Sequence, residues 1–67
     1  MNDKQSIIRA IHTTNGTVKY LYQYPDGPLQ GLIKGVDAEE EATLFTYEVA
    51  LEISRQFKNN FWKYEVI

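Results

Sequence analysis

The dipeptide Asn15-Gly16 stands between two runs of strand-forming residues, at positions 6–13 and 17–24. Asn and Gly tolerate the positive φ angles of a type I′ turn, so this pair is a strong short-range predictor of a β-hairpin. Side chains of the second run alternate between two faces, and one face would carry Val18, Tyr20, Tyr22 and Tyr24. The chain is therefore expected to contain an antiparallel sheet.

A second turn is predicted at Pro25-Asp26-Gly27-Pro28, where Pro presets φ and Gly accepts a left-handed conformation. The run that follows, Leu29 to Val36, is interrupted by Gly31 and Gly35, which indicates a bulge or a close backbone approach. Together the three runs predict a three-stranded antiparallel meander.

Two interpretations compete for residues 37–58. In the first, Asp37 and the residues after it cap one long helix, whose apolar stripe would be Ala38, Ala42, Phe45, Val49, Ile53 and Phe57. In the second, a short strand at Ala42–Phe45 precedes a helix with Thr46 as its N-cap. We favour the second, because Leu44 and Leu51 fall outside the stripe of the long helix.

The shorter helix would turn an apolar stripe toward the sheet, formed by Val49, Ala50, Ile53 and Phe57. Asn59-Asn60 is expected to end it, since Asn tolerates a left-handed cap. A final strand over Phe61 to Ile67 would place Trp62, Tyr64 and Val66 on one face. The predicted fold is α+β, in the order β-β-β-(β)-α-β, with one helix packed on one face of a small antiparallel sheet. We expect residues 1–67 to form a single domain.

Composition limits how such a domain is stabilised. A chain of 67 residues buries only about 60% of its unfolded surface, so its free energy of unfolding is expected to be small. The absence of Cys excludes disulfides and thiolate zinc sites. Hydrophobic residues make up 43% of the chain and aromatic residues 13%, which is enough for a packed core. A homodimer would be one way to bury the remaining aromatic surface.

The chain also carries no predicted targeting or membrane segment. Met1 to Ser6 is polar, without the apolar stretch of a signal peptide, and no apolar run approaches the length of a membrane span. We therefore expect a cytoplasmic protein.

Catalytic patterns are lacking as well. The chain has one histidine, His12, and no cysteine that it could activate as a nucleophile. It also has no nucleophile elbow, phosphate loop or His-Glu metal motif. The run Glu39-Glu40-Glu41 could offer oxygen ligands to a hard cation, but consecutive side chains point in different directions. We expect no enzymatic activity, no metal site and no cofactor.

Charge is segregated along the sequence. The stretch 37–52 contains no Lys or Arg, yet it holds six of the nine acidic residues: Asp37, Glu39, Glu40, Glu41, Glu48 and Glu52. One interpretation is a solvated loop followed by a helix N-terminus, where Glu48 complements the helix dipole. The functional alternative is an acidic patch, defined as Asp37, Glu39, Glu40 and Glu41, that docks on a basic groove of a partner protein.

An aromatic and basic surface is the second candidate site. Its residues would be Lys19, Tyr20, Tyr22, Tyr24, Trp62, Lys63 and Tyr64, on one sheet face, with Lys34 nearby. Aromatic rings beside lysines can stack single-stranded bases, at ~1–3 kcal/mol per base. However, Leu21 is the one apolar residue on the other face of its strand, so we expect the tyrosine stripe to face the helix as core. Any exposed remainder would suit a protein interface.

The end of the chain carries the pattern Ala-x-x-Phe-Thr-x-x-x-Ala-x-x-Ile, followed by Tyr-Glu-Val. The matching residues are Ala42, Phe45, Thr46, Ala50, Ile53, Tyr64, Glu65 and Val66. This segment resembles the ending of very short phage and prophage accessory proteins. Some proteins of that kind inhibit host defence, including anti-CRISPR proteins that bind an effector nuclease.

The resemblance implies a phage or prophage protein in the cytoplasm of a bacterial host. Its function would be to bind and block a host protein, through an acidic patch that meets a groove built for nucleic acid. The alternatives are a small single-stranded nucleic-acid-binding protein, which would use the aromatic and lysine face, and an assembly module that forms a homodimer.

Overall fold

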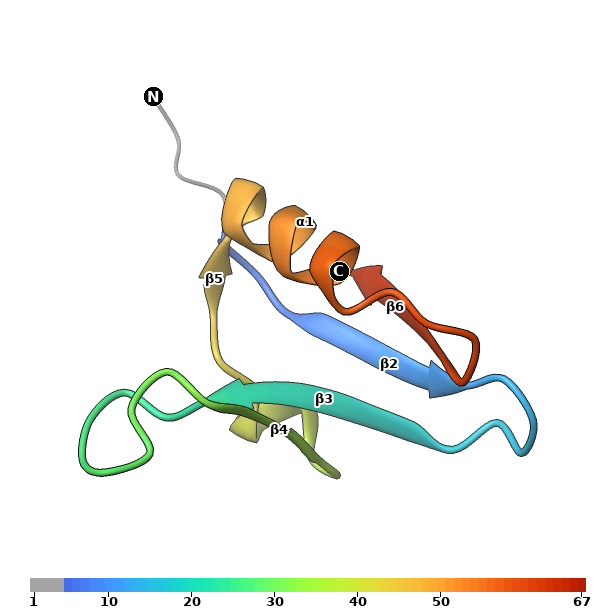
Figure 1. The fold of residues 1–67 in the computed structure, drawn as a ribbon, viewed down its shortest axis with the longest axis horizontal. Helices are drawn as coiled ribbons and strands as arrows, with labels where there is room; N and C mark the ends of the chain where they lie inside the picture. Colours follow the sequence, from blue (N-terminus) through green and yellow to red (C-terminus); the bar gives the residue numbers. More distant parts are fainter. Residues whose placement is uncertain (1–4) are drawn as a thin grey trace.

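The computed structural model describes residues 5–67, so most of the polar stretch Met1 to Ser6 lies outside the described residues. The fold is a small α+β domain (Figure 1). In chain order its elements are β1 (Gln5–Ser6), β2 (Ile8–His12), β3 (Val18–Gln23), β4 (Ile33–Val36), the 3-10 helix η1 (Glu39–Glu41), β5 (Phe45–Thr46), α1 (Tyr47–Gln56) and β6 (Trp62–Val66). Within this part of the chain no helix has the length and apolarity needed to cross a membrane.

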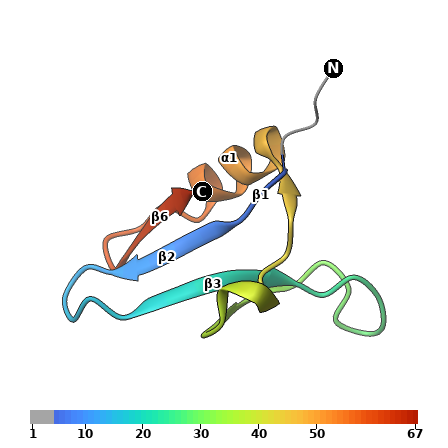
Figure 2. The ribbon, with the colours of Figure 1, turned by 180° about the vertical axis from the view of Figure 1, so that it is seen from behind.

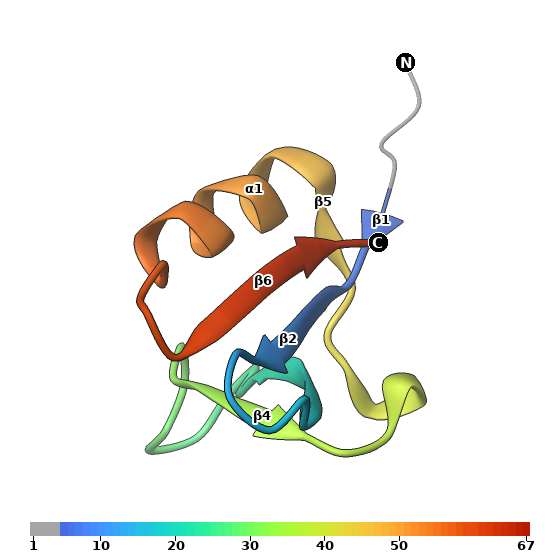
Figure 3. The same cartoon turned by 90° about the vertical axis from the view of Figure 1, so that its right-hand side faces the viewer.

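The main sheet has four antiparallel strands in the order β4-β3-β2-β6. The predicted meander is present as β2, β3 and β4, and the C-terminal strand joins the opposite side of β2. Ile7 separates β1 from β2, and β1 pairs with β5 in a second, two-stranded sheet (Figure 2). Helix α1 lies along β6 on one face of the main sheet (Figure 3), which confirms the predicted fold class.

The core lies between α1 and the main sheet. Its buried residues are Ile8, Ala10, Leu21, Phe45, Ala50 and Ile53, with Ile33, Trp62, Tyr64 and Val66 packed against them. Directly paired residues of neighbouring strands point to the same face, so the pairs Ile8–Val66 and Ala10–Tyr64 place β2 and β6 side chains together under the helix. The predicted common face of Trp62, Tyr64 and Val66 is confirmed.

The first hairpin is present, but its turn is not type I′. That turn needs positive φ at both Asn15 and Gly16, whereas among the described residues only glycines have positive φ, Gly16 at 75°. The loop is longer than two residues: the His12 N–H donates to the Thr17 carbonyl, and the Gly16 N–H donates to the His12 carbonyl. The Asn15 side-chain oxygen accepts from the Thr17 N–H at 2.9 Å. Asn15 therefore stabilises the turn with a side-chain hydrogen bond, not with a left-handed backbone conformation.

The next loop corrects the predicted third strand. Gly27 has the expected left-handed conformation, with φ of 80°. Gly31 has φ of 88° and belongs to the turn, so the strand begins at Ile33 rather than at Leu29. Gly35 does mark a close approach, since a Cβ built there would lie 3.2 Å from Lys19 Cβ.

The long-helix interpretation of residues 37–58 is wrong. Residues 39–41 form a separate 3-10 turn, and Thr46 is the N-cap of α1, where its hydroxyl accepts from the Val49 N–H at 3.3 Å. The strand before the helix covers Phe45 and Thr46, later than the predicted Ala42–Phe45.

Two details of the helix also differ from expectation. Ala50 and Ile53 are buried against the sheet as predicted, but Val49 is 47% exposed and Phe57 is 37% exposed. The helix ends at Gln56 without a left-handed residue. Asn59 acts through its side chain instead, which donates to the Phe57 carbonyl at 2.8 Å and accepts from two N–H groups that lead into β6.

Candidate functional site

The predicted aromatic and basic surface is divided between the two faces of the main sheet. Tyr20 pairs with Arg9, and Tyr22 pairs with Lys34, which puts these tyrosines on the face away from α1. Lys19 pairs with Ala10, a core residue, and so points to the helix side. The expectation of one shared face is therefore wrong.

The expectation that the tyrosine stripe forms the core is also wrong. Leu21, from the other face of β3, is the buried residue, at 6% exposure, while Tyr20, Tyr22 and Tyr24 are half-buried. A single apolar side chain from β3 is sufficient because α1 lies along β6, and Ile8 and Ala10 of β2 supply much of the sheet's share of the core.

On the helix side, three other members of the set, Lys19, Trp62 and Tyr64, line a groove of about 230 Å³. Trp62 and Tyr64 lie there beside Leu21 and Ile33. The Trp62 ring makes an edge-to-face contact with His12, with centroids 4.8 Å apart. Lys19 and Lys34 also line this groove, and the ammonium of Lys19 is paired with Asp37. The rest of the lining is largely apolar.

On the opposite side, the tyrosines make a more polar site. The rings of Tyr22 and Tyr24 meet edge to face, with centroids 5.3 Å apart. The Lys34 ammonium lies 5.6 Å from the Tyr22 centroid and 5.3 Å from that of Tyr24, within the range of a cation–π interaction. These three residues, with Val36 and Glu41, line a hollow of about 380 Å³, which we call the tyrosine hollow.

The three glutamates of the acidic patch form η1, which lies next to β3 on the side away from α1 (Figures 1 and 2). The Lys19–Asp37 ion pair holds the start of this segment. Thr43 holds its end: its N–H donates to the Leu21 carbonyl at 3.1 Å, and its hydroxyl accepts from the Gln23 N–H at 2.8 Å. The position of η1 on the sheet is thus fixed at both ends.

The three glutamates of η1 are exposed, and no Lys or Arg of residues 5–67 forms an ion pair with them. Beside them Leu44 is 62% exposed. With Ile7 and Ala42, Leu44 lines a second hollow of about 560 Å³, to which Glu39 and Glu40 also belong. Sequence analysis missed Leu44 as a surface residue, although its position outside the helical stripe was the available indication.

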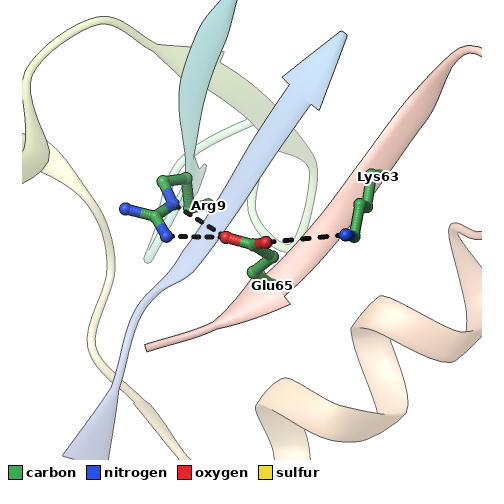
Figure 4. Close-up of polar contacts among 3 residues, drawn as sticks. All are labelled: Arg9, Lys63 and Glu65. Atoms are coloured by element: carbon green, nitrogen blue, oxygen red, sulfur yellow. Dashed lines mark hydrogen bonds and ion pairs between the residues drawn. The ribbon is translucent and has the colours of Figure 1, made fainter. Parts of the chain in front are cut away.

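A polar network crosses the face that carries the tyrosines (Figure 4). Glu65 accepts two hydrogen bonds from Arg9, at 3.1 Å from Nε and 2.6 Å from Nη2, and Lys63 Nζ lies 3.9 Å from its other oxygen. The hydrogen bonds from Arg9 lower the pKa of Glu65 below its ordinary value, against partial desolvation, and the charges of Arg9 and Lys63 add to the effect. Lys63, predicted for partner binding, is therefore exposed and forms an ion pair with Glu65 within the chain.

Among residues 5–67, no group of three or more His, Asp or Glu side chains is arranged to hold a metal ion. Comparisons with known proteins give no match to this chain, whether among protein-family models, curated proteins or solved structures.

Proposed function

We propose that this chain is a non-enzymatic binding protein that docks its acidic patch on a basic surface of another protein. One observation carries the proposal: Glu39, Glu40 and Glu41 are exposed in a single turn, without an ion-pair partner among residues 5–67. Like charges in one turn repel each other, and a basic partner relieves that repulsion on contact.

Leu44 supports the same surface from the apolar side. An exposed leucine next to charged residues gives an interface a small apolar centre with a polar rim, the arrangement typical of protein interfaces. Asp37 contributes less to docking, because its charge is used by Lys19. Within the acidic patch, the three glutamates are the residues on which binding is expected to depend.

The biological setting that we propose is a phage or prophage protein that blocks a host defence effector, as anti-CRISPR proteins do. Its support is the resemblance of the C-terminal segment to endings of such proteins. In the structure this segment supplies the buried Phe45, the N-cap Thr46 and the buried Ala50 and Ile53. The shared pattern therefore consists of core and helix-capping residues. A nucleic-acid channel lined by Lys and Arg is the kind of basic groove that three exposed carboxylates would fit.

The geometry does not favour the nucleic-acid-binding alternative. A stacking platform needs its rings and lysines on one face, and the strand register separates Tyr22 from Trp62. Glu41 also lines the tyrosine hollow, where its charge would repel a phosphate. A homodimer stays a prediction.

The proposal is tested with a matched pair of charge reversals. Glu39→Lys/Glu40→Lys changes the patch, and Glu48→Lys/Glu52→Lys changes helix α1 by the same net charge. Tagged protein is used to capture partners from nuclease-treated lysate, and the affinity for a captured partner is measured at several salt concentrations. We expect the patch variant to lose at least about tenfold in affinity, ~1.4 kcal/mol, and much of its salt dependence.

The helix variant should retain both, and circular dichroism should show that both variants are folded. Equal losses in the two variants would show that only net charge matters. Unchanged binding by the patch variant would overturn the acidic-docking proposal.

A further inference from the structure

The tyrosine hollow combines two aromatic rings, a carboxylate and a cation at one place on the surface. Tyr22 and Tyr24 present their rings, Glu41 comes from η1, and the Lys34 ammonium lies over both rings. We propose that this hollow is an arginine-binding site, which takes the guanidinium of an arginine side chain from the partner protein. The inference rests on the proposed function and names the group that the docking surface would hold.

The Lys34 contact shows what the ring pair can bind. Its ammonium lies 5.6 Å and 5.3 Å from the two centroids, so the negative faces of the rings already attract a cation. No carboxylate among residues 5–67 forms an ion pair with Lys34, although Glu41 lines the same hollow. The hollow therefore contains a cation and an anion that do not neutralise each other directly.

An arginine would satisfy both features at once. Its planar guanidinium can stack on a tyrosine ring while its N–H groups donate to a carboxylate, which a compact ammonium cannot do in the same way. Glu41 has no ion-pair partner among residues 5–67, and it shares the acidic turn with Glu39 and Glu40. A basic groove approaching η1 would bring arginines to this position first.

Lys34 competes for the site. It is exposed, and an exposed cation–π contact contributes only ~0.5–1 kcal/mol, so an incoming guanidinium can displace it. Two substitutions should then have effects of opposite sign. Tyr24→Leu removes a ring and weakens arginine binding, whereas Lys34→Met removes the competitor and strengthens it.

The probe is the blocked peptide acetyl-Gly-Arg-Gly-amide, compared with its citrulline analogue, which has the same shape and no charge. The full chain is titrated with each peptide at low salt, and the ring resonances of Tyr22 and Tyr24 are followed by NMR. We expect saturable shifts with the arginine peptide only, lost in Tyr24→Leu, and a several-fold lower Kd in Lys34→Met. Lys58→Met is the matched control, since Lys58 is also an exposed lysine without an ion pair in the described chain, and it should change Kd far less.

Equal shifts with citrulline, or the same change in Lys34→Met and Lys58→Met, would overturn the arginine site. Stronger shifts with inorganic phosphate than with the arginine peptide would also overturn it, because they would make Lys34 an anion-binding residue. These failures are distinct from failure of the proposed function: binding of a host partner that depends on Glu39 and Glu40 would still stand.

Discussion

At the scale of single residues, Asn59 makes more local hydrogen bonds than its place in a short connection suggests. Its Oδ1 accepts from the N–H of Phe61 at 2.7 Å and of Trp62 at 2.9 Å, and its Nδ2 donates to the Phe57 carbonyl. The residue therefore joins the end of α1 to the start of β6. Few side chains could replace it, because it must accept and donate at the same time.

We predict that Asn59→Ala lowers the free energy of unfolding by ~1–2 kcal/mol, since three hydrogen bonds to the backbone are lost at a partly solvated site. Urea denaturation measures the change. Asn60→Ala is the matched control, because the recorded contact of Asn60 uses its backbone carbonyl, which accepts from Thr13. Equal losses in both variants would mean that the Asn59 side chain has no special role.

The same residue shows what a sequence can predict at this scale. Asn15-Gly16 and Asn59-Asn60 were correctly predicted to break regular structure, and Gly16 has the predicted positive φ, but the left-handed conformations predicted for the asparagines were wrong. Asn can stop an element either with a left-handed backbone or with side-chain hydrogen bonds, and one sequence does not separate the two. Here both Asn15 and Asn59 use their side chains.

At the scale of elements, the start of α1 depends on one hydroxyl. Thr46 Oγ1 accepts from the Val49 N–H, and Thr46 is also the last residue of β5. We predict that Thr46→Ala lowers the free energy of unfolding by ~1 kcal/mol, because an N–H of the first helical turn loses its acceptor. Thr46→Ser keeps the hydroxyl and should retain most of the stability. If urea denaturation gave the same loss for both substitutions, the effect would come from the methyl group rather than from the cap.

The orientation of β3 was the main error at this scale. Alternation along residues 17–24 predicted the strand and both of its faces, and β3 does alternate. Which face meets the helix is decided elsewhere in the chain, since Ile8 and Ala10 supply a small, apolar surface on the side of Leu21. The three tyrosines are long enough to be half-covered without a helix, so their number misled the prediction.

Of the two candidate sites, sequence could predict the one that depends on local residues but not the one that depends on contacts between distant segments. The acidic patch could be identified from local sequence, because charged residues in a turn are exposed wherever the turn lies. The tyrosine hollow could not, since it needs Glu41 to lie beside Tyr22 and Tyr24, far away in the sequence. That contact depends on the path of residues 37–43 across β3, for which no periodic pattern exists.

At the scale of the whole molecule, the Arg9–Glu65 ion pair links β2 to the C-terminal strand β6. Arg9 in β2 is paired with Glu65 in β6, and the two residues are 56 positions apart in the chain. A contact of this kind is absent from the unfolded chain, so its ionisation is coupled to folding.

Folding therefore has a predictable pH dependence. The pKa of Glu65 is lower in the folded protein than in the unfolded chain, where a glutamate has its ordinary value of about 4.3. The unfolded state then takes up the proton first as the solution is acidified. Stability from this pair is fully present above that ordinary value, and it is lost as pH falls toward and through the folded pKa.

We predict that Glu65→Gln is less stable than the parent protein at pH 7, and that the difference shrinks below about pH 4.3 and is nearly gone once Glu65 is protonated in both states. Gln resembles the protonated carboxyl in shape, so the remaining contacts are closely matched. Urea denaturation of both proteins between pH 7 and pH 3 measures the difference directly. In the background of Arg9→Met, which removes the hydrogen-bond donor, the same substitution should show a much smaller difference at pH 7. A difference that stays constant down to pH 3 would contradict the coupling, because it would mean that Glu65 acts through packing rather than through its charge.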